Sequence, residues 1–339
     1  MPATRSLSRR IARGLVWGFG LLLAIIALTL MYFRWQASER EIRDRHDAAP
    51  PGGRFVRAGD VEVFVQEAGP ATGTVVLFMH GTGAWSETWR ESMTALAQAG
   101  FRAVALDLPP FGYSQRPATA QYSKGEQARR IIGVLDALDV RQAILVGHSF
   151  GAGPTVEATI LAPERVKALV LVDAALSIRE AHEPPKPQPT LERGFFAAKP
   201  VRDAVVATFL TNPAFTRQLL QHFMANPQAA TDARVALYQQ PLVVQGSTHA
   251  IGDWLPELMH APRTSRSEDP AAYAAISVPV VAIWGAHDTI TPLPQGERVV
   301  KLLPRARLEL LPGVGHIPQI ENPAEFNRVL VSVMNGFHL

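Results

Sequence analysis

The chain has 339 residues, of which 47% are hydrophobic and 19% are charged, so it is long enough to bury a large globular core. It contains no cysteine, which excludes disulfide bonds, thiolate metal ligands and a cysteine nucleophile. The net charge is +3, but the first 45 residues hold eight arginines against three acidic residues, a net +5 that leaves −2 for the remainder. The body of the chain therefore offers no basic field for nucleic acid.

A run of nineteen residues without a charge lies near the N-terminus, at 15–33. As a helix of about 1.5 Å per residue it just spans a hydrocarbon core of roughly 30 Å, and Trp17, Tyr32 and Trp35 lie near its ends, where amphipathic rings favour the interface. Four arginines and no acidic residue precede it within the basic N-terminus, 1–14. We therefore predict a single-pass membrane protein whose body lies outside the cytoplasm. A cleaved signal peptide is the alternative, but its apolar region is usually only about 7–15 residues long.

Residues 34–54 are polar at first and then rich in proline and glycine, which predicts a short helical extension followed by a linker. The folded domain is predicted to begin at Phe55. Residues 55–57 and 61–67 alternate apolar and polar side chains around Gly59-Asp60, a pattern typical of a β-hairpin.

From residue 74 onward, short apolar runs alternate with helical segments. Strands are predicted at 74–79, 102–106, 143–146, 167–172, 278–284 and 307–311, and helices at 86–98, 123–138, 152–162 and 322–334. This alternation predicts a mostly parallel, doubly wound α/β sheet, built from residues 55–173 and 277–339. The active site of such a sheet lies beyond the carboxyl ends of its strands.

The alternation stops between residues 174 and 276. A proline-rich stretch at 183–189 is followed by segments of helical character with scattered aromatic residues. A structureless loop of this length is implausible in a compact domain. We therefore predict a helical cap inserted between two strands of the sheet, with most of its aromatic residues in the core of the cap.

The strand at 143–146 leads into Gly147-His148-Ser149-Phe150-Gly151 and then into a helix, the sequence form of a nucleophile elbow. The two glycines leave room for the backbone and for the helix at a tight turn. Ser149 is therefore the predicted nucleophile. The amide of Phe150, the first of the following helix, is predicted to face developing negative charge.

A serine hydroxyl becomes a good nucleophile only when a base takes its proton and a carboxylate orients that base. Asp288 follows the strand at 278–284, and His316 follows the strand at 307–311. We predict these residues as acid and base. Asp173 also follows a strand and is the rival for the acid position.

These stretches together resemble an α/β-hydrolase-fold serine hydrolase of the capped esterase type, over residues 55–339. The matching motifs are HGTG at 80–83, DLPPFGYS at 107–114, GHSFG at 147–151, GAHD at 285–288 and GHIP at 315–318. The resemblance implies that the HGTG loop completes the oxyanion hole through the amide of Thr82, beside that of Phe150. His80, His148 and Asp107 are expected to brace or pack their loops.

The predicted function is hydrolysis of a carboxylic ester, apolar or lipid-like, through an acyl-enzyme, with no cofactor and no metal. A small-molecule ester and the membrane are the expected partners, and the residues that bind the substrate are not predicted. Carbon–carbon bond cleavage, amide hydrolysis and cofactor-free haloperoxidation on the same triad stay open as alternatives, because the fold hosts many chemistries. A non-catalytic binding module of the same fold also stays open. Epoxide hydrolases and dehalogenases are disfavoured, since their resemblance requires an aspartate where Ser149 stands.

Overall fold

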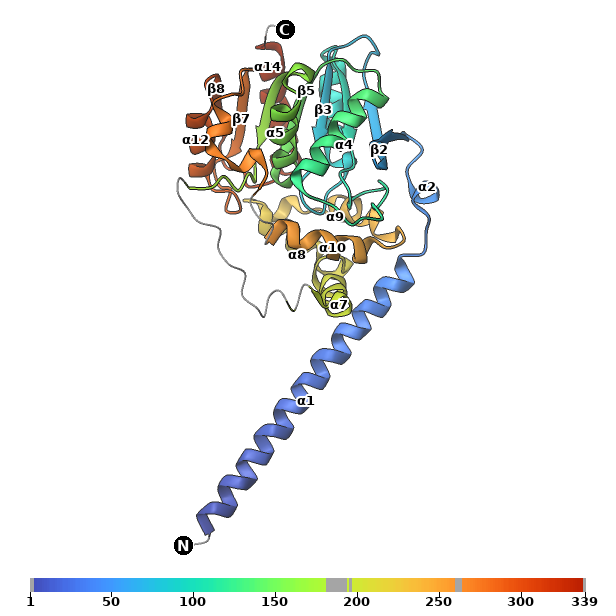
Figure 1. The fold of residues 1–339 in the computed structure, drawn as a ribbon, viewed down its shortest axis with the longest axis vertical. Helices are drawn as coiled ribbons and strands as arrows, with labels where there is room; N and C mark the ends of the chain where they lie inside the picture. The colour runs from blue at the N-terminus through green and yellow to red at the C-terminus, as the bar shows by residue number, and fades with distance from the viewer. Residues whose placement is uncertain (1–2, 181–193, 195–196, 260–263, 338–339) are drawn as a thin grey trace.

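The computed structural model describes residues 3–180, 194, 197–259 and 264–337. One eight-stranded sheet forms its centre, and a long N-terminal helix extends from one end of the domain (Figure 1). The strands are β1 (Gly53–Ala58), β2 (Val61–Ala68), β3 (Val75–Met79), β4 (Arg102–Leu106), β5 (Ala143–His148), β6 (Val166–Val172), β7 (Val280–Gly285) and β8 (Ala306–Leu311).

The sheet has the order β1-β2-β4-β3-β5-β6-β7-β8. Strands β1 and β2 form the predicted hairpin, in which Gly59 has a positive φ, and β2 pairs with β4 in antiparallel fashion. All other neighbours are parallel, so the carboxyl ends of β3 to β8 meet at one edge. The predicted fold class is confirmed.

Helices cover both faces of the sheet and bury its continuous apolar strands. Helices α3 (Arg90–Gln98) and α14 (Pro323–Asn335) pack on one face, and α4 (Lys124–Ala137), α5 (Ala152–Leu161) and α12 (Leu293–Leu302) pack on the other. Ser123 begins α4 as expected of a cap, because its hydroxyl accepts a hydrogen bond from the Glu126 amide at 3.3 Å.

The segment between β6 and β7 contains helices and no strand within its described residues. The longer helices are α7 (Lys199–Phe209), α8 (Pro213–Phe223), α9 (Asp232–Gln239) and α10 (Ser247–Met259), followed by the short α11 (Pro270–Tyr273). They lie over the carboxyl ends of the strands (Figure 1). The proline-rich stretch at 183–189 lies outside the described residues.

Helix α1 (Ala3–Arg40) continues seven residues past the predicted membrane segment and is followed by the short α2 (Arg45–Ala48). Over Ala12–Arg40 it is long and apolar enough to cross a membrane, as a membrane anchor or a signal sequence would be. The predicted helical extension is therefore present, and it continues because residues 34–40 contain neither proline nor glycine.

Residues 34–54, predicted as a helical extension and a linker, contact the cap in the structure. Arg43 forms a two-bond bridge with the cap, donating its amide to the Val243 carbonyl at 3.1 Å and accepting from the Gln245 amide at 2.9 Å. Arg40 donates to the Leu242 carbonyl at 3.1 Å, and Ala37 is buried. The chain is thus held against the cap before the proline- and glycine-rich residues begin.

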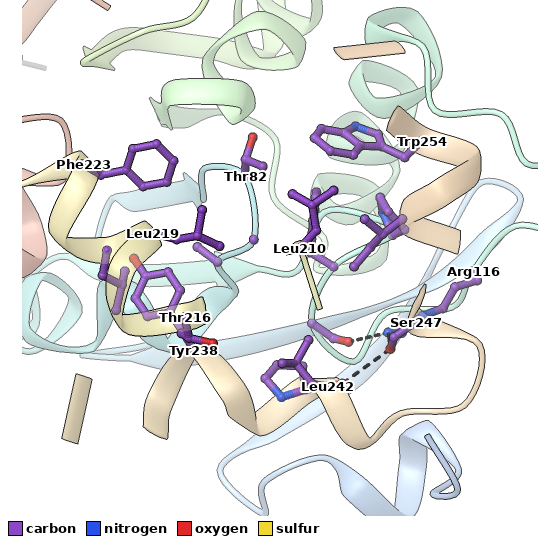
Figure 2. A pocket seen from close by; sticks show the side chains of 18 residues that line it. Thr82, Arg116, Leu210, Thr216, Leu219, Phe223, Tyr238, Leu242, Ser247 and Trp254 are labelled. Atoms are coloured by element: carbon purple, nitrogen blue, oxygen red, sulfur yellow. Dashed lines mark hydrogen bonds between the residues drawn. The ribbon is translucent and has the colours of Figure 1, made fainter. Parts of the chain in front are cut away.

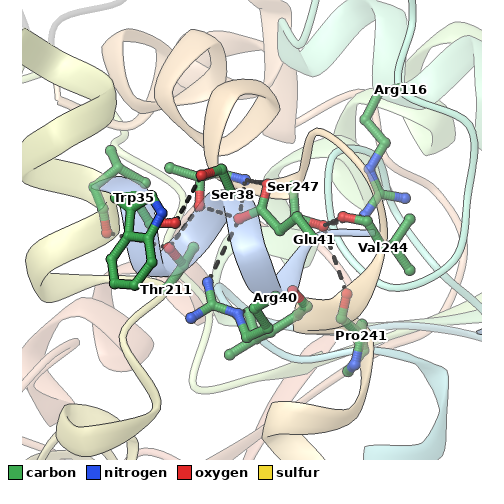
Figure 3. Close-up of polar contacts among 12 residues, drawn as sticks. Trp35, Ser38, Arg40, Glu41, Arg116, Thr211, Pro241, Val244 and Ser247 are labelled. Carbon is green, nitrogen blue, oxygen red and sulfur yellow. Dashed lines mark hydrogen bonds and ion pairs between the residues drawn. The ribbon is translucent and has the colours of Figure 1, made fainter. Parts of the chain in front are cut away.

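Glu41 is the centre of this junction (Figure 3). Both of its carboxylate oxygens accept a hydrogen bond from the Thr248 amide, at 3.1 and 3.2 Å, and one also accepts from the Thr248 hydroxyl. Thr248 lies in the first turn of α10, where a negative charge is favourable. Glu41 therefore acts as a helix cap at the N-terminal end of α10, although it lies 207 residues from Thr248 in the sequence.

We expect Glu41→Ala to lower the free energy of unfolding by about 1–2 kcal/mol, as for loss of a helix cap or of a hydrogen bond to a charged group. Glu39→Ala is the matched control, because Glu39 is an exposed carboxylate two residues away on α1. Denaturant unfolding of both full-length variants in detergent checks this. Equal loss of stability in the two variants would contradict the capping role.

Candidate active site

Ser149 lies at the sharp turn between β5 and α5. Its φ is +49°, in the left-handed region that non-glycine residues rarely adopt, so the surrounding structure has to hold it there. A Cβ at Gly147 would come within 2.6 Å of the Thr155 hydroxyl, and one at Gly151 within 2.5 Å of the His80 carbonyl. Both glycines of the predicted elbow are therefore needed for close packing.

The structure brings together the three residues predicted as nucleophile, base and acid. His316 Nε2 lies 2.8 Å from Ser149 Oγ, and His316 Nδ1 lies 2.8 Å from Asp288 Oδ2. All three side chains are buried. They come from the ends of β5, β7 and β8, where the parallel order of the sheet gathers polar side chains at one edge.

The carboxylate of Asp288 is oriented by its own loop. Its Oδ1 accepts hydrogen bonds from the amides of Ile290 at 2.7 Å and Thr291 at 3.0 Å, and its Oδ2 accepts from the Thr291 hydroxyl at 2.6 Å. Burial alone would raise the pKa of Asp288, but the bonds and charge of His316, together with Thr291, lower it to about 2. Asp288 is therefore an anion suited to stabilise a positive imidazolium.

Asp173, the rival acid, has a different environment. Its Oδ1 accepts from the Gly285 amide at 2.9 Å, and its buried Oδ2 has no hydrogen-bond partner. Burial, and then the charge of Asp288, raise its pKa well above the ordinary value and so favour the neutral form of the carboxyl. The geometry favours Asp288 for the acid position.

Asp173, Asp288 and His316 place one potential metal ligand each within 4.8 Å of one another. However, both nitrogens of His316 already lie at hydrogen-bond distance from Asp288 and Ser149, so the ring has no nitrogen left for an ion. His287, considered in the sequence because it adjoins Asp288, is exposed and does not join the cluster. These contacts fit hydrogen bonding better than metal binding.

Three further buried groups hold the loops of the site. His80 accepts from the Leu108 amide at 2.9 Å and lies 2.8 Å from the Gly81 carbonyl, while Asp107 accepts from the amides of Ser86 and Tyr113, both at 2.7 Å. His148 lies 2.8 Å from the His316 carbonyl and 3.3 Å from Gln319 Nε2. His148 is therefore a positioning residue for the loop that carries His316.

We expect acid to destabilise the fold through two of these histidines. Burial lowers the pKa of His80 to about 4 and that of His148, which also faces His316, to about 3. The unfolded chain binds these protons near pH 6.5, whereas the folded chain binds them only at lower pH. The free energy of unfolding should therefore fall as the pH is lowered from about 6.5 to 4, by up to about 1.4 kcal/mol per pH unit for each histidine. Burial raises the pKa of Asp107 to about 6, so this one carboxyl offsets part of the loss that the two histidines cause.

The measurement is denaturant unfolding followed by tryptophan fluorescence at several pH values in this range. His148→Gln keeps a side-chain donor for the His316 carbonyl but cannot titrate, so its stability should depend less steeply on pH. An unchanged slope in this variant would contradict the assignment.

The loop predicted to complete the oxyanion hole passes directly beside Ser149. A Cβ at Gly81 would come within 3.1 Å of the Ser149 Cβ, and Thr82 follows it in the wall of a cavity. Phe150 begins the turn into α5, and its ring packs edge-on against Trp254 at 5.1 Å. The oxyanion roles of the Thr82 and Phe150 amides stay a prediction.

The cavity beside the triad is bounded by the cap and by two loops of the sheet (Figure 2). Phe223 forms the part of the cavity wall nearest His316, with 5.8 Å between the two ring centroids. Ser149 and His316 are not among the described residues that line the cavity. Apolar and aromatic residues of the cap supply half of the described lining: Leu210, Leu219, Leu220, Phe223, Tyr238, Pro241, Leu242, Ile251 and Trp254. The sequence predicts that most aromatic residues of the cap lie in its core. Phe223, Tyr238 and Trp254 instead line the cavity, and Phe209 is exposed.

Among the described residues that line this cavity, Arg116 alone is charged, and the sequence offered no signal for it. Its terminal nitrogens donate to the Ser114 carbonyl at 2.6 Å, the Gly112 carbonyl at 3.0 Å and the Ser247 hydroxyl at 2.9 Å, while its buried Nε has no partner. Burial lowers its pKa to about 10, so it remains a cation. Its charge is mostly engaged by the protein.

The family model described as the alpha/beta hydrolase fold matches residues 74–323. The chain is 30% identical over 284 residues to a 2-hydroxymuconate semialdehyde hydrolase from Pseudomonas sp. (strain CF600), covering 82% of this chain and 92% of that protein. Among solved structures it is similar to a meta-cleavage product hydrolase from Pseudomonas fluorescens IP01, at 25% identity and a TM-score of 0.66, covering 84% and 98%. It is also similar to a membrane phospholipase A described as a bacterial virulence factor, at 25% identity and a TM-score of 0.67, covering 96% and 99%.

Proposed function

The chain belongs to the α/β-hydrolase fold family, and from this membership and the geometry of its site we propose that it is a serine hydrolase that cleaves carboxylic esters of apolar acyl chains. The observation that carries the proposal is the continuous set of contacts from Ser149 through His316 to Asp288, with both distances at 2.8 Å. That arrangement suits nucleophilic attack by a serine on a carbonyl carbon.

In the proposed mechanism, His316 Nε2 takes the proton of Ser149 Oγ as the oxygen attacks the substrate carbonyl. The anion of Asp288 holds Nδ1–H and stabilises the imidazolium that forms. The amides of Thr82 and Phe150 donate to the oxyanion, a contribution of about 10²–10³ in rate for one donor. His316 then protonates the leaving alcohol and activates water, which releases the acyl group.

The apolar cavity supports an acyl chain as the bound group. Of the lining residues that the structure describes, nine come from the cap and are apolar or aromatic, and the cation among them, Arg116, is mostly engaged by the protein. Similarity to the membrane phospholipase A extends over 96% of this chain, whereas the meta-cleavage product hydrolase covers 84%. These observations support a lipid-like ester.

Carbon–carbon bond hydrolysis is the second candidate, and the names of the sequence relatives favour it over ester hydrolysis. The 2-hydroxymuconate semialdehyde hydrolase is the curated relative with 30% identity. Such a substrate carries a carboxylate, and within the described part of the cavity wall the Nε–H of Arg116 is a cationic donor without a hydrogen-bond partner. The two candidates share the same triad and differ in what the cavity binds.

We further propose that α1 is retained as an anchor and that the hydrolase body lies outside the cytoplasm. The charge-free run at 15–33 and the four arginines before it support this orientation. Resistance to carbonate extraction, and digestion of the body by protease added outside spheroplasts, are expected. Mature protein that begins after Phe33 would instead make the segment a signal peptide.

We expect purified protein to react with a fluorophosphonate probe at Ser149 and to hydrolyse a medium-chain p-nitrophenyl ester with a higher kcat/KM than a 2-hydroxy-6-oxo-dienoate. Labelling without turnover of either substrate would support a reactive Ser149 but would count against both proposed substrates. Faster turnover of the dienoate would replace the ester proposal with carbon–carbon bond hydrolysis. Failure to label would favour a binding module.

A further inference from the structure

Beyond its exposed first residue, Lys199, helix α7 of the cap presents apolar side chains outward and its other ionic side chains inward. Val201, Val205 and Phe209 are spaced four residues apart and so share one face, on which Val201 is 47% and Phe209 is 54% exposed. Arg202 and Asp203, in contrast, are buried. A helix at a water-exposed surface has the opposite arrangement.

The inward ionic residues of α7 are bound by α10. Arg202 Nη2 lies 2.6 Å from Asp253 Oδ1 and 3.2 Å from Asp203 Oδ1. Asp203 Oδ2 in turn lies 2.6 Å from His249 Nδ1. These contacts hold the two helices together and fix which face of α7 points outward. The exposed apolar face is therefore a fixed feature of the cap.

The level of α7 relative to a bilayer follows from its contact with α1. The two helices pack against each other (Figure 1). Over the C-terminal part of α1, the partly or fully buried side chains Leu30, Phe33 and Ala37 are spaced three or four residues apart, as expected of the face that packs on the domain. Leu30 and Phe33 belong to the charge-free run at 15–33.

That run is about 27 Å long from Leu15 to Phe33, so if it spans a core of roughly 30 Å its C-terminal end lies at the edge of the hydrocarbon. A helix that packs against Leu30 and Phe33 then lies at the same level. Tyr32 and Trp35, both exposed on α1, have the amphipathic rings that favour this depth.

From these observations we propose that the outer face of α7 is seated in the boundary between the lipid headgroups and the acyl chains, so that the cavity takes its substrate from the leaflet. Leu210, which follows α7, is part of the cavity wall and is also exposed, so the lipid-facing surface is continuous with the cavity. The inference rests on the proposed retention of α1 as an anchor, and it holds for either bond-cleaving chemistry.

The absence of cysteine from the chain allows a direct test of this contact. Val201→Cys and Phe209→Cys in the full-length protein each receive an environment-sensitive fluorophore. Leu310→Cys on β8 is the matched control, because Leu310 is 46% exposed and lies in the sheet away from α1. The labelled proteins are placed in phosphatidylcholine vesicles with and without a lipid that carries a nitroxide near the top of its acyl chain.

The labels at positions 201 and 209 should lose most of their fluorescence in the nitroxide vesicles, while the label at 310 should keep it. Equal fluorescence at all three positions would overturn the proposal. Protection of the labels at 201 and 209 from the nitroxide that appears only as the protein-to-lipid ratio rises would also overturn the proposal. It would indicate that a second copy of this chain covers α7.

A functional variant separates this inference from the proposed reaction. Val201→Glu should lower the hydrolysis of an ester embedded in vesicles several-fold and leave hydrolysis of a water-soluble short ester unchanged, with Leu310→Glu as control. An equal fall for both substrates, or no fall for the vesicle substrate, would count against the lipid contact. If the unaltered protein hydrolyses neither ester, the proposed reaction fails, whereas the fluorescence result still decides where α7 lies.

Discussion

Replacing Ser149 with alanine is expected to lower kcat/KM toward a short p-nitrophenyl ester by about 10⁵-fold or more, because the loss of one triad residue removes most of the catalysis. The fold should be unchanged, since the alanine Cβ occupies the position that the serine Cβ already holds at φ +49°. Esterase assays with unfolding curves of the same preparations check both parts of the expectation.

Ser92→Ala is the matched control for this variant. Ser92 is also buried, but its hydroxyl lies 2.6 Å from Asn327 Oδ1, between α3 and α14. Its activity should stay within a few-fold of the unaltered protein. Unchanged turnover in Ser149→Ala would remove Ser149 from the nucleophile position, and equal losses in the two variants would indicate damage to the fold.

The sheet and the gathering of the triad could be predicted from the sequence because both depend on local patterns. A strand buried on both faces has to be continuously apolar, and the runs that became β3, β4 and β7 contain no charge within their buried residues. Polar residues directly after such strands meet at one edge through the parallel order alone. The loop positions of Asp288 and His316 therefore carried the prediction of a triad.

The cap and the junction with α1 could not be predicted in the same way, because they depend on contacts between segments far apart in the sequence. Glu41 reads as one charge in a polar stretch until α10 brings the Thr248 amide to it. Val201 and Phe209 likewise give no sign of their exposure, since the same residues are as common in a core. What surrounds a side chain, rather than its identity, decided these cases.

The choice between Asp288 and Asp173 depends on both kinds of information. Both aspartates follow a buried strand, β7 and β6, and the sequence predicts Asp288 as the acid with Asp173 as its rival. Their environments separate them, because Thr291 and His316 surround one carboxylate with donors and the other keeps a single amide donor. Burial therefore favours the neutral carboxyl at Asp173, whereas the donors around Asp288 favour its anion.

This difference leads to the second large prediction. Asp288→Asn should lower kcat by about 10⁴-fold, because an amide keeps the shape but offers His316 Nδ1 the wrong partner and leaves the imidazolium without its anion. Asp173→Asn should cost less than about tenfold, because an amide resembles the neutral carboxyl that burial favours at this position, and its oxygen can still accept from the Gly285 amide. The measurement is kcat for one ester across a range of pH.

The dependence on pH distinguishes an acid that orients the base from one that only supports it. Loss of the Asp288 anion should lower the pKa that governs kcat, since an imidazolium beside a carboxylate holds its proton more firmly than one beside an amide. Asp173→Asn should leave that pKa unchanged, because burial already favours the neutral form of the carboxyl that it replaces. If Asp173→Asn instead gives the larger fall in kcat and moves the profile, the acid of the triad lies at the end of β6 and Asp288 only holds the loop.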